Sequence, residues 1–148
     1  MTIAIGSDHG GFELKKEIMA HLTQRGFEVK DFGTYNAESC DYPQYGEAVS
    51  RAVAAGEYER GILVCGTGIG VSIAANKVKG AYAACVHDIY QAQRAQLSNN
   101  ANIITMGAQV IGTELAKCMV TEYLSLTYDP NSRSKEKVER IVDFENGK

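Results

Sequence analysis

A cysteine stands where a short apolar run meets a glycine-rich loop. Residues 61–70 read Gly-Ile-Leu-Val-Cys-Gly-Thr-Gly-Ile-Gly, so Cys65 ends a predicted buried strand. Residues 71–75 are mainly apolar and predict a helix, which puts the thiol between the carboxyl end of a strand and the amino end of a helix. Parallel sheets bind ligands at this position and the helix dipole favours negative charge there. A thiolate at Cys65 is therefore a candidate nucleophile or base.

The glycines after this cysteine predict an anion site. Gly66, Gly68 and Gly70 have no side chains, so consecutive backbone N–H groups can turn inward and hold an oxyanion or a phosphate. Thr67 adds a hydroxyl that can donate and accept a proton. Together these groups can remove a proton next to a carbonyl. Two other interpretations stay open: an inert buried cysteine, and a loop that binds a mononucleotide or makes a tight turn.

Asp8 and His9 form a second candidate pair in a glycine-flanked loop that follows a short apolar run. A carboxylate can bind sugar hydroxyls, and an imidazole titrates near neutral pH. The alternative is a turn residue beside a surface imidazole. His21 falls inside a predicted helix and is expected to be structural. His87 follows another predicted strand, but Asp88 beside it is explained by helix capping alone.

Arg133 and Lys137 are four residues apart in a charged segment predicted as the last helix, residues 133–145. That spacing puts both side chains on one helix face. Charges on a terminal helix are usually solvated. If the helix reaches a partner subunit, the forked guanidinium and the point charge of the lysine can close over a phosphate.

Five predicted strands, each followed by a helix, organise these residues. The strands are expected near residues 3–5, 27–32, 62–64, 81–86 and 102–106, and the helices near 14–22, 43–53, 71–75, 88–97, 112–126 and 133–145. Such repeats predict an α/β fold, a single three-layer α/β/α Rossmann-like domain over residues 1–148 with a five-stranded parallel sheet. The loops after the strands share one sheet edge, so Asp8, His9, Tyr42 and Cys65 can converge.

Composition narrows the class of protein. The chain has 148 residues, 45% of them hydrophobic and 22% charged, which fits one soluble domain with a full core. A net charge of −3 argues against a nucleic-acid partner. No apolar run approaches the roughly 20 residues needed to cross a bilayer, and no signal-peptide pattern opens the chain, so we expect a cytoplasmic protein without a membrane partner. The spacing of the four cysteines predicts neither disulfides nor a metal site.

Four segments resemble the ribose-5-phosphate isomerase B family: residues 6–11, 41–43, 65–77 and 99–107. Related galactose-6-phosphate and allose-6-phosphate isomerases share much of this pattern, and the similarity spans nearly the whole chain. The resemblance implies an aldose-ketose isomerase for a sugar phosphate that needs no metal or organic cofactor. It also implies a homodimer or homotetramer in which the site is shared between subunits and the C-terminal helix packs on a partner.

The resemblance assigns roles to individual residues. Cys65 matches the base that moves a proton between C1 and C2 of the open-chain sugar, and Thr67 matches the residue that helps to move the hydroxyl proton. The loop formed by residues 66–70, hereafter the glycine loop, matches the segment that stabilises the enediolate. Fixed N–H donors stabilise that anion more than the neutral substrate. Further positions that contact the substrate in the family fall on Gly66, Gly68, Ile69, Gly70, Asp8, Tyr42, Asn99, the phosphate-binding Arg133 and His9, which we also count as catalytic.

Three positions depart from the family pattern. Ser98 stands where many members have the histidine that opens the sugar ring, and serine cannot serve as an acid or base near neutral pH. Lys137 and Gln109 stand where arginines are common, so we expect these residues to bind the substrate in a different arrangement. We hypothesise that ring opening falls to Asp8 and His9, or that the substrate is acyclic, as a tetrose 4-phosphate would be.

The leading hypothesis is the conversion of ribose 5-phosphate into ribulose 5-phosphate through an enediolate. The alternatives within the same class are isomerases of a hexose 6-phosphate (allose or galactose) or of a tetrose 4-phosphate. A hypothesis from another class is a non-catalytic phosphate- or nucleotide-binding module of flavodoxin-like build. Such a module needs no thiol in its anion loop.

Overall fold

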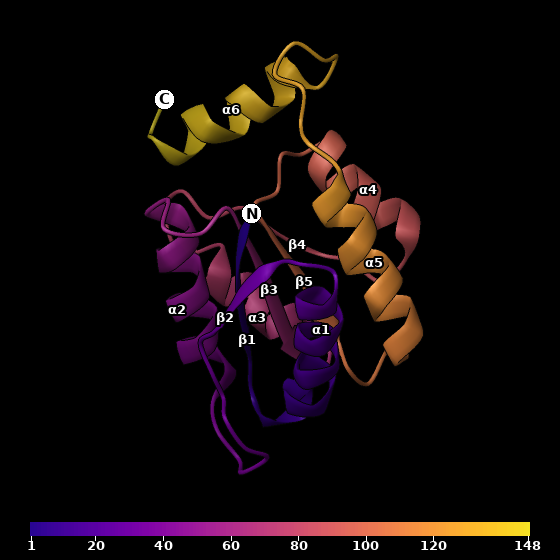
Figure 1. Ribbon diagram of the computed structural model, residues 1–148. Helices are drawn as coiled ribbons and strands as arrows, with labels where there is room; N and C mark the ends of the chain where they lie inside the picture. The colour runs from indigo at the N-terminus through magenta and orange to yellow at the C-terminus, as the bar shows by residue number, and fades with distance from the viewer.

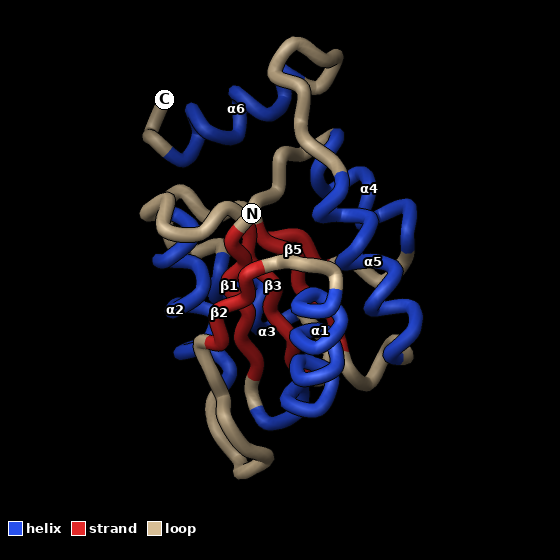
Figure 2. Tube along the Cα trace, in the orientation of Figure 1, coloured by secondary structure: helices blue, strands red, loops and turns tan.

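Five parallel strands form one sheet in the computed structural model, which describes residues 1–148 (Figure 2). The strands are β1 (Thr2–Ser7), β2 (Glu28–Asp31), β3 (Arg60–Cys65), β4 (Ala83–Cys85) and β5 (Ile103–Gly107). Their order across the sheet is β2-β1-β3-β5-β4, and each neighbouring pair is parallel. Strand β2 lies on one side of β1 and strand β3 on the other. The strand order therefore reverses between β1 and β3. Ligands bind at such a reversal in open α/β sheets.

Helices cover both faces of the sheet, which confirms the predicted three-layer architecture (Figure 1). One face carries α1 (Phe12–Gln24), α4 (Ile89–Leu97) and α5 (Thr113–Ser125), and the other carries α2 (Tyr42–Ala54) and α3 (Ile69–Ala75). A short 3-10 turn, η1 (His9–Gly11), links β1 to α1. No helix combines the length and the apolar character that a membrane span requires.

The two-residue period of the strands decides which side chains face which helices. In β3, Ile62 and Val64 belong to the core beneath α1, α4 and α5, whereas Leu63 and Cys65 belong to the core beneath α2 and α3. Burying an aliphatic side chain of this size contributes roughly 1.5–3 kcal/mol. The same alternation that fills both cores therefore directs the thiol toward the α2 and α3 face.

Three predicted helix boundaries are confirmed. Gly26 follows α1 with a φ of 89°, Pro43 lies in the first turn of α2, and Asp88 caps α4 by accepting the Gln91 N–H at 2.6 Å. The caps satisfy backbone groups that a helix end leaves unpaired.

Two predicted boundaries were too wide. The fourth strand has three residues rather than residues 81–86, because it lies at the sheet edge with β5 as its one neighbour. The Asn76 side chain pairs with both the N–H and the C=O of Ala83 and so blocks the open edge. The last helix, α6 (Lys135–Glu145), begins after a turn in which Asp129 O accepts the Ser132 N–H, so Arg133 precedes the helix.

Helix α6 lies apart from the three layers, across the edge of the sheet where the strands begin (Figure 1). None of its residues is buried, and Ile141 and Phe144 are exposed. Its last residue, Glu145, accepts hydrogen bonds from Gly80 N–H and the Tyr82 hydroxyl. The helix is thus tied to the chain at its C-terminal end, and Ile141 and Phe144 remain uncovered while Val138 and Val142 are half-buried.

Candidate active site

The loop after β1 touches the loop after β3. Asp8 Oδ1 accepts the Gly11 N–H at 3.1 Å, which caps η1, and the Asp8 N–H donates to Val64 O at 3.3 Å. A Cβ added at Gly10 would lie 3.3 Å from Asp8 Oδ1 and 3.4 Å from Gly66 N. The carboxylate is therefore held next to the start of the glycine loop. This position was predicted, because the two loops follow neighbouring parallel strands.

Cys65 is nearly enclosed, with 5% of its surface exposed, and its sulfur faces the glycine loop. Cys65 Sγ accepts the Gly68 N–H at 3.1 Å, so a backbone donor of the loop points at the sulfur. The N–H groups of Gly66 and Thr67 have no hydrogen-bond partner in the chain. Gly68 has a φ of 78°, and a Cβ there would lie 2.6 Å from the Met106 carbonyl carbon. Only glycine fits a loop that brings these amides beside the sulfur.

Strand β5 packs against the glycine loop and supports its backbone. Thr105 Oγ1 donates to Gly68 O at 2.7 Å, and a Cβ at Gly107 would lie 2.6 Å from the carbonyl carbon of Thr67. Thr67 and Ile69 remain exposed, and Thr67 Oγ1 accepts the Ile69 N–H at 3.2 Å. The backbone of the loop is therefore fixed, and the Thr67 side chain is accessible to solvent.

His9 is exposed and rests on the backbone of Cys40. Its Nδ1 lies 3.1 Å from Cys40 N and 3.2 Å from Cys40 O. A neutral ring accepts the amide proton at Nδ1 and carries its own proton on Nε2, whereas an imidazolium can donate from Nδ1 to the carbonyl. Both protonation states thus find a partner. Sequence reasoning did not identify Cys40, and the one available signal was its place immediately before Asp41 and Tyr42.

Two more predicted residues border the glycine loop. Tyr42 begins α2 and its ring covers Gly70, where an added Cβ would lie 2.5 Å from a ring carbon. Gln109 donates its N–H to Gly66 O at 3.0 Å and places its side-chain amide 3.3 Å from the position of a Gly66 Cβ. The end of the sheet where the strands finish, hereafter the carboxyl edge, therefore brings together seven features: Asp8, His9, Tyr42, Cys65, Thr67, Gln109 and the glycine loop.

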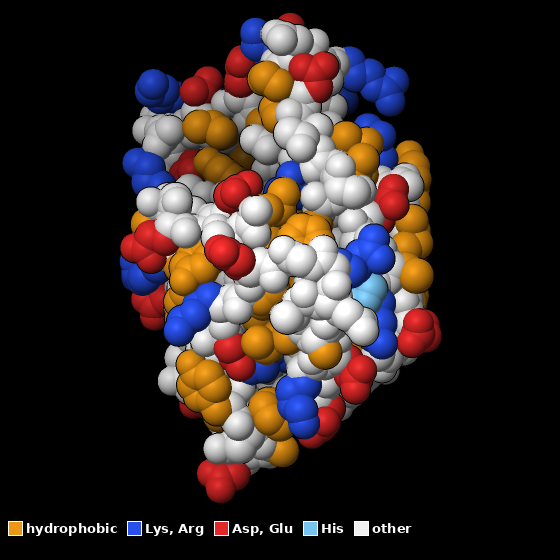
Figure 3. All heavy atoms as spheres, viewed as in Figure 1, with side chains coloured by type: hydrophobic (Ala, Val, Ile, Leu, Met, Phe, Trp, Pro, Cys, Tyr) orange, Lys and Arg blue, Asp and Glu red, His pale blue; other side chains and the backbone are white.

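Four predicted residues lie at the opposite end of the sheet, where the strands begin. Ser98, Asn99, Arg133 and Lys137 line a cavity of about 520 Å³, hereafter the polar cavity, between α6 and the segment that leads into β5. Neither Arg133 nor Lys137 forms an ion pair within the chain. Figure 3 shows Lys and Arg side chains along the end of the molecule that carries α6. Within one chain, the phosphate-binding candidates are thus separated from Cys65 by the length of the strands.

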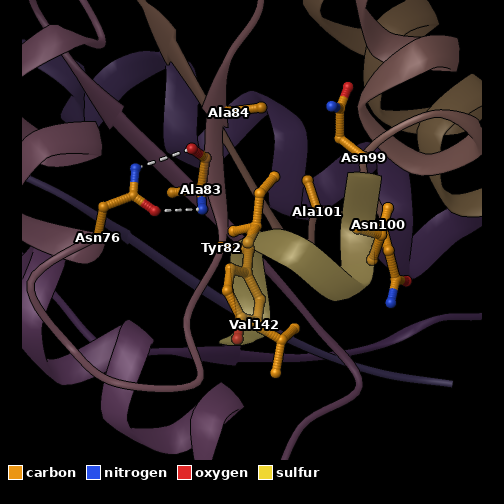
Figure 4. Close-up of a pocket in the computed structure, with 10 residues that line it drawn as sticks. Asn76, Tyr82, Ala83, Ala84, Asn99, Asn100, Ala101 and Val142 are labelled. Carbon is orange, nitrogen blue, oxygen red and sulfur yellow. Dashed lines mark hydrogen bonds between the residues drawn. The ribbon is translucent and has the colours of Figure 1, made fainter. Parts of the chain in front are cut away.

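A second cavity of about 310 Å³, hereafter the apolar cavity, lies beside the polar one between α6 and the start of β4 (Figure 4). The Tyr82 ring points toward Val142 of α6, and its hydroxyl donates to Glu145 Oε2 at 2.5 Å. Burial, followed by this hydrogen bond, raises the pKa of Tyr82 to about 12. The phenol therefore remains a donor to α6 across the neutral and mildly alkaline range.

A buried lysine supports the carboxyl edge. Lys15 of α1 is fully buried and donates to Asp31 Oδ1 at 2.7 Å and to Thr34 O. It ties the end of β2 to the segment that leads to Cys40. Sequence reasoning did not find this lysine, because Lys15 and the exposed Lys16 are indistinguishable without knowledge of the sheet.

The two other histidines differ in position. His87 lies at the carboxyl edge, and its Nε2 accepts the Gly107 N–H at 3.0 Å, which supports the strand beneath the glycine loop. His21 contacts Thr121 Oγ1 on α5 at 2.7 Å. Burial, followed by the positive charge of Arg25, lowers the pKa of His21. His21 therefore joins α1 to α5, in agreement with the structural role expected for it.

Known proteins resemble the chain over nearly its full length. A family model described as Ribose/Galactose Isomerase matches residues 3–141. Ribose-5-phosphate isomerase B of Escherichia coli is 48% identical over 143 residues, with 97% of this chain and 95% of that protein covered. D-erythrulose-4-phosphate isomerase 2 of Mycolicibacterium smegmatis is 44% identical, with 98% and 97% covered. The solved structure of Clostridium thermocellum ribose-5-phosphate isomerase B superposes with a TM-score of 0.96 at 46% identity, covering 99% of both chains. The chain belongs to the ribose/galactose isomerase family.

Proposed function

We propose that this chain is an aldose-ketose isomerase that converts ribose 5-phosphate into ribulose 5-phosphate. The observation that carries the proposal is the Cys65 sulfur, which faces the Gly68 amide beside the unpaired amides of Gly66 and Thr67. The similarity to ribose-5-phosphate isomerase B over 97% of the chain supports the same substrate. A base next to fixed N–H donors is suited to form and stabilise an enediolate.

The proposed proton transfers begin at C2 of the open-chain aldose. The Cys65 thiolate removes the C2 proton, the C–H electrons form a C1–C2 double bond, and the negative charge moves to O1 near the glycine loop. The Thr67 hydroxyl transfers a proton from O2 to O1. The thiol then returns its proton to C1, and O2 becomes the ketone oxygen. No electrons leave the substrate, so we propose that the reaction needs no metal or organic cofactor.

We propose that Asp8 and His9 open the sugar ring. Ring opening requires a proton for the ring oxygen and a group that removes the proton of the anomeric hydroxyl. With Nδ1 held by the Cys40 amide, the neutral His9 ring carries its proton on Nε2 and can donate it. Asp8 Oδ2 has no partner in the chain and can accept a proton. Ser98 has no group that titrates in this range.

We also propose that the complete site forms between two copies of the chain. The six residues of β3 span about 20 Å, a length that separates Cys65 from the polar cavity within one chain. The exposed Ile141 and Phe144 on α6 and the adjacent apolar cavity support packing against another copy. In a homodimer or homotetramer, Asn99, Arg133 and Lys137 of one copy would bind the phosphate of a substrate held at Cys65 of the other.

Two further parts of the proposal concern organisation and location. Both core clusters draw on the same strands, which supports one domain over residues 1–148. We place the protein in the cytoplasm, because all four cysteines are free and thiols stay reduced in that compartment.

A tetrose 4-phosphate is a second candidate substrate. D-erythrulose-4-phosphate isomerase 2 of Mycolicibacterium smegmatis is 44% identical to the chain, and Ser98 provides no acid for ring opening. A tetrose 4-phosphate cannot close the five-membered ring, since the hydroxyl that would form it carries the phosphate. This substrate therefore makes no demand on the residue at position 98.

A substrate panel tests the proposal. Wild type and Cys65→Ala are assayed on ribose 5-phosphate, erythrose 4-phosphate and allose 6-phosphate, with Cys118→Ala as the matched control because Cys118 is exposed on α5. We expect Cys65→Ala to lose about 10³-fold or more in kcat on each substrate that the wild type converts, and Cys118→Ala to remain fully active. Retained turnover in Cys65→Ala would exclude the thiol as the base. Phosphate binding without any turnover in the wild type would favour the binding module.

A further inference from the structure

Ser98 holds an arginine at the border of the polar cavity. Arg94 Nε lies 2.7 Å from Ser98 Oγ, one helical turn away along α4. Arginine can only donate hydrogen bonds, so the serine oxygen is the acceptor. Ser98 lines the polar cavity, so this bond holds the Arg94 guanidinium against a residue of the cavity wall.

Most of the donor capacity of Arg94 is unused. A guanidinium has five N–H donors, of which Ser98 takes one, and no other acceptor in the chain contacts Arg94. No carboxylate lies within ion-pair distance of it. The side chain is half-buried, so part of its freedom is already lost before any ligand binds. Its Nη groups form a planar fork of the kind that pairs with two oxygens of a phosphate.

The charge around the polar cavity fits a dianion. Arg133 and Lys137 line the cavity and, like Arg94, form no ion pair. Two cations in the cavity wall and a third bonded to the wall residue Ser98, none with a carboxylate partner, provide strong attraction for a phosphomonoester and little for an uncharged sugar.

We propose that Arg94 is a third cationic ligand of the substrate phosphate and that Ser98 is the residue that positions it. This proposal rests on the proposed function, since it assigns the polar cavity to the phosphate of that substrate. Ser98 then acts through Arg94 by accepting its Nε proton.

The experiment measures phosphate binding separately from turnover. Inorganic phosphate is titrated calorimetrically into the intact protein at fixed ionic strength, and kcat and KM are measured on ribose 5-phosphate. The variants are Arg94→Gln, Arg94→Lys and Ser98→Ala. Arg140→Gln is the control, because Arg140 is exposed on α6 and donates to Lys148 O.

We expect Arg94→Gln to weaken phosphate binding and to raise KM by about 10-fold or more, with kcat changed by less than about 3-fold. Ser98→Ala should weaken binding by a few-fold, because the guanidinium persists but is no longer held, and Arg94→Lys should recover part of the loss. Arg140→Gln should match the wild type. Wild-type phosphate affinity in Arg94→Gln, or equal affinity in Ser98→Ala and the wild type, would overturn the proposal.

The outcome is distinguishable from a failure of the proposed function. If the wild type isomerises ribose 5-phosphate and Arg94→Gln binds phosphate normally, the assignment of Arg94 alone is wrong. If the wild type converts no sugar phosphate but binds phosphate through Arg94, the proposed function is wrong and Arg94 keeps its role. Should Arg94→Gln fold poorly by circular dichroism, Arg94→Lys and Ser98→Ala still decide, since both keep a charged or native side chain at position 94.

Discussion

His9 is held at one ring nitrogen by the backbone of Cys40, and this contact determines which proton the ring can give. With Nδ1 accepting the Cys40 N–H, the neutral ring offers its proton from Nε2. The Cys40 carbonyl, 3.2 Å from the same nitrogen, can accept a proton from the imidazolium. The backbone thus accommodates both protonation states of the residue that we propose opens the sugar ring.

Replacing His9 should separate cyclic from acyclic substrates. We expect His9→Gln to reduce kcat on ribose 5-phosphate by about 10²-fold or more, because general acid catalysis contributes factors of this size. Turnover of erythrose 4-phosphate should fall far less, because no ring has to open. His21→Gln serves as the control, since His21 contacts Thr121 away from the carboxyl edge. Equal losses on both substrates would exclude a role in ring opening.

Gly68 illustrates how one backbone conformation decides the site. Gly68 and Gly56 share a φ of 78°, but a Cβ at Gly68 would lie 2.6 Å from the Met106 carbonyl carbon whereas Gly56 has open space around it. We expect Gly56→Ala to cost about 1–2 kcal/mol in the free energy of unfolding, which is the penalty of a left-handed backbone for alanine. Gly68→Ala should cost about 1–3 kcal/mol more from the clash and should lose most activity.

Urea unfolding of both glycine variants, together with kcat on the preferred substrate, checks this prediction. Similar unfolding free energies in the two variants would mean that the loop moves aside without cost. Full activity in Gly68→Ala would show that the loop accepts a Cβ at this position without loss of function.

At the scale of elements, α6 depends on a small number of contacts. None of its residues is buried, and its side-chain hydrogen bonds to the body of the chain come from Glu145. Tyr82 donates one of these bonds from the α3–β4 connection. The position of α6 sets the polar cavity, so this pair at the C-terminal end of the helix influences Arg133 and Lys137 near its other end.

Removing the Tyr82 hydroxyl should loosen α6. We expect Tyr82→Phe to lower the free energy of unfolding by about 1 kcal/mol at pH 8, because a hydrogen bond typically contributes about this much to stability. The pKa of Tyr82 is raised to about 12, above the ordinary value of 10.0. The unfolded chain therefore loses its proton first, and the stabilisation is fully present below pH 10 and is lost as the pH rises toward 12.

Urea unfolding of wild type and Tyr82→Phe between pH 8 and pH 12 measures this difference directly. The gap between the two proteins should narrow over the upper part of the range. Tyr90→Phe is the control, because Tyr90 is exposed on α4. A gap that is constant with pH would contradict the assignment of the raised pKa to the folded state.

At the scale of the whole molecule, the two halves of the proposed site lie at opposite edges of the sheet. Cys65 and the glycine loop occupy the carboxyl edge, whereas Arg133 and Lys137 line the polar cavity at the amino edge. A substrate smaller than the sheet cannot touch both halves of one chain. Two copies related by a rotation axis can join them, and symmetric association produces equivalent sites.

Mixing two inactive variants tests this arrangement. Cys65→Ala lacks the proposed base, and the double variant Arg133→Ala with Lys137→Ala lacks two proposed phosphate-binding cations, so each variant alone should be nearly inactive. After unfolding and refolding together in equal amounts, mixed dimers contain one intact site out of two, and about a quarter of the wild-type activity should return. A mixture as inactive as its components would show that each site lies within one chain.

The order of strands and helices, their caps and the glycine loop could be predicted from the sequence. These features depend on local rules: apolar periodicity, residues that end helices, and glycines where a backbone needs a positive φ. The convergence of Asp8, Tyr42 and Cys65 was also predictable, because the carboxyl ends of parallel strands meet at one edge. The lengths of β4 and α6 could not be predicted. Strand β4 is short because it has one neighbouring strand, and α6 begins late because a turn precedes it.

Only the tertiary structure separated Ser98, Asn99, Arg133 and Lys137 from the cysteine, bonded Arg94 to Ser98, and buried Lys15. Each of these outcomes depends on which elements pack together and at which end of the sheet they meet. Residue types and spacing specify a helix face or a strand end, but contacts between distant elements follow from the strand order and the path of the connections. The sequence by itself therefore determined the candidate base and its glycine loop, and the folded chain decided where the proposed phosphate-binding groups lie.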